Sequence, residues 1–124
     1  MTGEVNYTKA MSKPFVSVII PAYNEASRLP LTLIDVDRHL SEQDYEYEVI
    51  VVNDGSTDGT AEMVKRFASL MKHVKFINNP TNMGKAAALR IGMLAAKGEW
   101  FVAMDASNTV SIVEFTKMLP YVRS

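Results

Sequence analysis

The sequence predicts a three-layer α/β/α fold built on a mainly parallel sheet, and three observations lead to this class. Short apolar runs rich in β-branched residues alternate along the chain with segments of helical periodicity. The chain has 124 residues, the length of one domain, and 48% of them are hydrophobic, enough for a core. Polar, turn-forming residues follow the apolar runs, where the strands of a parallel sheet would end.

Four apolar runs are predicted as strands because each is too short for a helix and is bounded by turn-forming residues. They cover residues 15–20, 47–52, 74–77 and 100–104. Pro21 is expected to end the first strand, since proline cannot donate a backbone hydrogen bond. Residues 1–14 are polar and aperiodic, and are expected to form a flexible leader to a single domain over residues 15–124.

Helices are predicted after each strand, where apolar side chains recur at intervals of three and four residues. Three of them cover residues 29–40, 85–96 and 112–119. A fourth helix is predicted after an N-cap at Thr57 or Asp58. Its side chains that point into the core are expected to be Met63, Val64, Phe67 and Leu70. Right-handed crossovers between parallel strands then give the strand order 3-2-1-4, and such sheets bind ligands at the carboxyl ends of their strands.

Composition narrows the classes of function. The formal net charge of −1 gives no reason to expect nucleic acid or an anionic membrane as a partner. The absence of cysteine excludes disulfides and thiolate zinc sites. No apolar run approaches the roughly 18 residues of a transmembrane helix, and the N-terminus lacks the pattern of a secretory signal, so we expect a cytoplasmic protein.

The segment after the first strand reads PAYNE, from Pro21 to Glu25. Pro21 fixes the turn and Tyr23 offers a flat face and a hydroxyl, so the two are suited to stack against a nucleotide base. The alternative is a plain strand-to-helix turn in which Asn24 or Ser27 caps the helix. Taken alone, this segment leaves both interpretations open.

Charged residues mark the ends of the other strands. Asp54 follows the second strand, and its carboxylate suits the N–H of a uracil or guanine ring or a ribose hydroxyl. Lys85 opens a helix after Gly84, where phosphate is attracted, although the spacing is not that of a P-loop; the alternative is a solvated lysine. Asp105 follows the fourth strand and is a weak candidate for a divalent cation, because Ser107 adds only a neutral oxygen.

Four motifs follow one another along the chain: VSVIIPAYNEASRLP, YEVIVVNDGSTDGT, NPTNMGKAAALRIGMLAAKGEW and FVAMDAS. In order and spacing they resemble the family 2 glycosyltransferases of the GT-A fold, most of all the dolichyl- and polyprenyl-phosphate glycosyltransferases. The resemblance implies a Rossmann-like nucleotide-sugar-binding half. Such a half takes a hexose from a UDP- or GDP-sugar, such as UDP-glucose or GDP-mannose. In the full-length family the hexose passes to a polyprenyl (dolichyl) phosphate.

The resemblance also implies roles for the matching positions. The base and ribose would be lined by Pro21, Ala22, Tyr23 and Glu25. Asp54 would bind the base, and Lys85 would lie near the sugar nucleotide. Asp105, followed by Ala106, would be the first carboxylate of the DxD motif, which contacts ribose or metal. Mg²⁺ or Mn²⁺ bridges the diphosphate in such enzymes, but Ser107 replaces the second carboxylate, so weak metal binding is expected.

The chain stops soon after the DxD position, and no residue is nominated as the base that deprotonates the acceptor. Two alternatives follow: a catalytically inactive nucleotide-binding module, or a half-enzyme that depends on a partner chain. An unrelated dinucleotide-binding domain fits less well, since the first strand leads to PAYNE rather than to GxGxxG. We also expect a homodimer through the fourth strand or the last helix, because nothing later in the chain covers them.

Overall fold

The computed structural model describes residues 14–107 and 110–123, so the predicted leader lies outside the described residues except for Pro14. The chain folds around a four-stranded sheet in the order β3-β2-β1-β4, in which neighbouring strands are parallel. Its strands are β1 (Val16–Ala22), β2 (Tyr47–Asp54), β3 (Val74–Asn79) and β4 (Trp100–Ala103). The strand order predicted from the sequence is confirmed.

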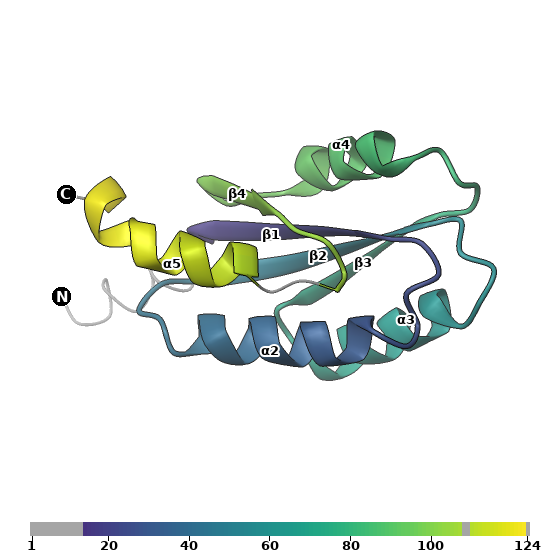
Figure 1. Cartoon of the computed structure of the whole chain (residues 1–124), viewed down its shortest axis with the longest axis horizontal. Coiled ribbons are helices and arrows are strands. Elements are labelled where there is room, and N and C mark those ends of the chain that lie inside the picture. Colours follow the sequence, from purple (N-terminus) through teal and green to yellow (C-terminus); the bar gives the residue numbers. More distant parts are fainter. Residues whose placement is uncertain (1–13, 108–109, 124) are drawn as a thin grey trace, which may run out of the picture.

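Helices cover both faces of the sheet (Figure 1). They are α2 (Leu29–Ser41), α3 (Thr60–Leu70), α4 (Lys85–Ala95) and α5 (Val110–Arg123). Of the described helices, α4 lies alone on one face, against β1 and β2, and the other three lie on the opposite face (Figure 1). The predicted three-layer α/β/α arrangement is therefore confirmed.

Alternate residues of a strand point to opposite faces of the sheet, so the core has two parts. The larger part lies between the sheet and the helices α2, α3 and α5. Ile20 of β1 and Leu33 of α2 are fully buried in this cluster. A smaller cluster on the other face includes Ala88 of α4. Gly92 brings α4 close to the sheet, since a Cβ there would lie 2.5 Å from Ile19 Cγ2. This close packing sets the distance between α4 and the sheet.

β1 continues through Pro21, so the expectation that this proline ends the strand is wrong. Pro21 pairs with Val52 of β2 in the parallel register. Its nitrogen lies on the same side of the strand as the carbonyl of Ile19, which accepts a hydrogen bond from Met104 N. β4 has already ended at Ala103, so it presents no carbonyl opposite the N–H that Pro21 lacks.

Other bounds differ from the prediction by a few residues. β2 extends to Asp54 and β3 to Asn79, and α5 is longer than the predicted helix at both ends. β4 ends one residue before Met104. Leu70 was expected to point inward but is exposed, because it is the last residue of α3.

β4 is an edge strand, as predicted, since β1 is its only neighbour in the described part of the sheet. Trp100 and Phe101 are exposed along it. On α5, Ile112 and Leu119 are buried and Met118 is exposed. The expected homodimer remains a prediction. None of the described helices has both the length and the hydropathy of a membrane span.

Candidate functional site

The polar segments after β1, β2 and β4 meet at the carboxyl edge of the sheet, together with the start of α4. They line an open cleft of about 480 Å³, within the range of small-molecule sites. Its lining residues are Pro21, Ala22, Tyr23, Glu25, Asp54, Asn82, Gly84, Lys85, Asp105, Ala106 and Ser107. This set contains every residue that the sequence analysis assigned to nucleotide-sugar or metal contact. Asn82 and Gly84 join them from the loop before α4.

Asp54 fastens the loop before α4 to the end of β2. The residue is only 3% exposed. Its Oδ1 accepts hydrogen bonds from Asn79 Nδ2 at 3.1 Å and from Met83 N at 2.9 Å, and its Oδ2 accepts one from Gly84 N at 3.0 Å. The neighbouring Gly55 has φ +70°, and a Cβ there would lie 2.3 Å from the loop backbone. Asp54 therefore positions the loop, while Oδ2 retains the capacity to accept a further donor from the cleft.

Lys85 and Asp105 contact each other across the cleft. Lys85 is the first residue of α4, and Gly84 precedes it with φ 98° and no capping side chain. The Lys85 ammonium forms an ion pair with Asp105 Oδ1. Both side chains are more than half exposed, at 63% and 56%. The two residues predicted to meet the diphosphate and the metal thus neutralise each other here, and their exposure leaves both able to exchange partners.

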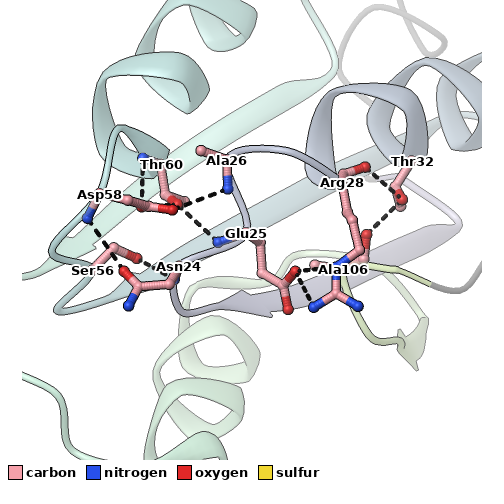
Figure 2. A network of polar contacts seen from close by, with 9 residues as sticks. All are labelled: Asn24, Glu25, Ala26, Arg28, Thr32, Ser56, Asp58, Thr60 and Ala106. Carbon is pink, nitrogen blue, oxygen red and sulfur yellow. Dashed lines mark hydrogen bonds and ion pairs between the residues drawn. The ribbon is translucent and has the colours of Figure 1, made fainter.

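A network of polar contacts joins the loop after β1 to the loop after β2 (Figure 2). Asn24, in the left-handed region at φ 54°, accepts hydrogen bonds at its Oδ1 from Thr57 N at 2.8 Å and Asp58 N at 3.3 Å. Asn24 N donates to Ser56 Oγ at 2.9 Å, and Glu25 N donates to Thr60 Oγ1 at 2.9 Å. The side chain of Asn24 therefore braces the two loops instead of capping a helix.

The structure shows which residues cap α2 and α3. The N-cap of α2 is Arg28, without a side-chain hydrogen bond, so neither Asn24 nor Ser27 caps that helix. At α3 the N-cap position is Gly59, but Asp58 accepts the first helical N–H, from Thr60, at 2.9 Å. The hydrogen bond from the Thr60 hydroxyl holds the pKa of Asp58 below its usual range.

Two further contacts hold α2 in place at the cleft (Figure 2). Thr32 Oγ1 donates to the carbonyl of Ala106, which links α2 to the segment after β4. The Glu25 carboxylate pairs with Arg28, with both distances at 2.9 Å. Tyr23 is 47% exposed beside these residues, and its ring is accessible for stacking.

The described residues do not supply the donor set of a divalent cation. No group of three His, Cys, Asp or Glu side chains that could hold a metal is found in residues 14–107 or 110–123. Asp105 offers one carboxylate, and Ser107, at the second position of the motif, offers a neutral hydroxyl. Hard cations in proteins require several oxygen ligands, commonly with charge. The side chains therefore fit a resident metal poorly.

Comparison with known proteins points to one family. Residues 17–124 match the family model "Glycosyl transferase family 2". A dolichyl-phosphate beta-glucosyltransferase of Trichomonas vaginalis is 38% identical over 118 residues, covering 90% of this chain and 36% of the relative. One from Dictyostelium discoideum is 32% identical over 111 residues, covering 84% and 34%. The chain spans about a third of the length of the curated relatives it matches.

Two solved structures share the fold. A mannosyltransferase from Pyrobaculum calidifontis, solved with GDP-Man and Mn²⁺, has a TM-score of 0.64 and 36% identity; the match covers 78% of this chain and 28% of that one. TarS residues 1–349 from S. aureus, solved with UDP-GlcNAc, have a TM-score of 0.65 and 26% identity, covering 89% and 32%. Both neighbours hold a nucleotide sugar.

Proposed function

The chain belongs to glycosyl transferase family 2, and on this premise we propose that it forms the donor-binding part of a hexosyltransferase that uses a UDP- or GDP-sugar. In a full-length enzyme the acceptor would be a polyprenyl phosphate such as dolichyl phosphate, in keeping with the names of the relatives. One observation carries the proposal: the residues assigned to nucleotide contact, from three strand ends and one helix start, line a single cleft.

The cleft offers a separate partner for each part of the donor. Tyr23 would stack on the base, because its ring is accessible and every base has a π-face. Asp54 Oδ2 would accept an N–H or a hydroxyl from the nucleoside. Lys85, at the positive end of α4, would meet the diphosphate, and Asp105 would meet the ribose.

The chemistry of transfer sets what the cleft must stabilise. The bond between the anomeric carbon and the diphosphate oxygen breaks as a new bond forms to the acceptor oxygen. Negative charge then builds on the departing nucleoside diphosphate, and a cation placed beside it lowers the barrier. Lys85 is the lining residue that can supply this positive charge. We propose no acceptor base among the described residues. Because the relatives are named as transferases, an inactive binding module is the less favoured alternative.

Calorimetric titration with UDP, GDP, UDP-glucose and GDP-mannose tests the proposal. One nucleotide and its sugar should bind, and Tyr23→Ala should weaken binding by about 1–3 kcal/mol, the cost of losing an aromatic stacking partner. Leu70→Ala is the control, because Leu70 is also exposed to solvent, at 83% against 47% for Tyr23, and lies at the end of α3, outside the cleft. Equal affinities for Tyr23→Ala and the wild-type chain would refute the base site.

A further inference from the structure

We propose that the ammonium of Lys85 takes the place of a divalent cation in this cleft, so that a nucleoside diphosphate binds without a metal ion. The inference rests on the proposed function, because it concerns the charge that faces the diphosphate of the same donor. It goes further in naming which group neutralises that charge. Weak metal binding then has a cause beyond the neutral Ser107: another cation already uses the carboxylate.

The first observation is the ion pair itself. Asp105 is the one carboxylate of the DxD position, and the Lys85 ammonium contacts its Oδ1. A metal ion bound at Asp105 would stand beside the Lys85 ammonium, and two cations on one carboxylate repel each other. Metal binding would therefore first require the Lys85 side chain to leave, and Ser107 offers no negative charge to compensate.

The second observation is the charge of the cleft. Three lining residues are acidic and one, Lys85, is basic. Glu25 is paired with Arg28, and Asp54 accepts three hydrogen bonds from the loop before α4, so each of these carboxylates has partners other than Lys85. Among the lining residues, Lys85 alone can supply a positive side chain to a diphosphate. The adjoining N-terminus of α4 adds partial positive charge, and its first turn contains no acidic residue.

The third observation is that the Lys85 backbone is held in place while its side chain is exposed and held only by the ion pair with Asp105. Met83 N and Gly84 N, directly before it, donate to the buried Asp54 carboxylate. Further along α4, Gly92 packs closely on β1. The Lys85 side chain is 63% exposed, and an exposed ion pair is held weakly. Its flexible four-carbon stem allows the ammonium to move from Asp105 to a phosphate oxygen within the cleft.

The test is calorimetric titration of UDP and GDP into the wild-type chain, once in EDTA and once in millimolar MnCl₂. The nucleotide that binds should show the same dissociation constant in both buffers, within about twofold. Lys85→Met should weaken metal-free binding by roughly tenfold or more, as expected for loss of a charge-assisted hydrogen bond. Lys85→Arg should restore most of it because it keeps the charge. Lys97→Met is the matched control, since it removes the same charge just beyond the other end of α4.

Electron paramagnetic resonance of Mn²⁺ gives a second measurement that needs no nucleotide. The signal of free Mn²⁺ should persist when wild-type chain is added and should decrease more with Lys85→Met, in which Asp105 is freed. Nucleotide binding that requires Mn²⁺, or wild-type affinity in Lys85→Met, would overturn the inference while leaving the proposed function intact. Failure of both nucleotides to bind in either buffer would overturn the inference and the proposed function together.

Discussion

Replacing Asp54 by asparagine should destabilise the fold and weaken nucleotide binding at once. The carboxylate accepts three hydrogen bonds, two of them from backbone N–H groups, and is 3% exposed. An amide of the same shape keeps one acceptor oxygen, so its NH₂ group must face a donor from Asn79, Met83 or Gly84. Losing one charge-assisted hydrogen bond and leaving a buried donor unsatisfied should cost about 2–3 kcal/mol of unfolding free energy. The loop that precedes Lys85 should loosen as well.

Urea denaturation measures the change in the free energy of unfolding. Calorimetric titration measures the nucleotide affinity, which we expect to fall by about 1–3 kcal/mol. Asp105→Asn is the informative control. Its ion pair with Lys85 is exposed, so its unfolding free energy should change by less than about 1 kcal/mol. An Asp54→Asn chain that unfolds at the wild-type urea concentration would show that the loop does not depend on Asp54. Unchanged nucleotide affinity would remove Asp54 from the site.

Three further predictions concern metal, pH and assembly. Ser107→Asp should tighten Mn²⁺-assisted nucleotide binding, because it adds a charged oxygen ligand beside Asp105; equal Mn²⁺ affinities in the two forms would contradict the role of Ser107. Burial raises the pKa of Glu48, but hydrogen bonds from Lys75, Ser17 and the Lys97 N–H outweigh it and hold the pKa below the ordinary value of 4.5. A lowered folded-state pKa contributes stability above the unfolded pKa that is lost as pH falls through the folded one. Urea midpoints should therefore drop more steeply below about pH 4.5 in the wild type than in Glu48→Gln, and identical pH profiles would refute this. Light scattering should show a concentration-dependent dimer through the β4 edge or α5, whereas a strict monomer at high micromolar concentration would exclude it.

Periodicity and composition were sufficient to predict the architecture. Parallel strands buried on both faces leave continuous apolar runs such as YEVIVV, and the crossover rule then limits the strand order. The bounds were less predictable where a neighbour decides them. Pro21 pairs with β2 and lies beyond the end of β4, and no local pattern in the sequence reports where a paired strand ends.

The members of the candidate site were predictable because strand ends converge, but their contacts were not. Asp54 was expected to face a ligand, and the structure shows it holding Met83 and Gly84, which lie about thirty residues later in the chain. The brace formed by Asn24 likewise depends on how two loops meet in space. Gly55 was the nearest signal, since a glycine at a strand end can mark close backbone approach.

Amide NMR spectra of the isotopically labelled chain, recorded during titration with UDP and GDP, test most directly whether the nucleotide lies in this cleft. The largest shift changes should fall at the backbone N–H groups of Tyr23, Gly84 and Ala106, which lie on three different segments of the lining. Residues at the other end of the sheet, such as Glu48 and Gly98, should not move. Shift changes gathered at that other end, or none with either nucleotide at millimolar concentration, would contradict a nucleotide-sugar site at the carboxyl edge of the sheet.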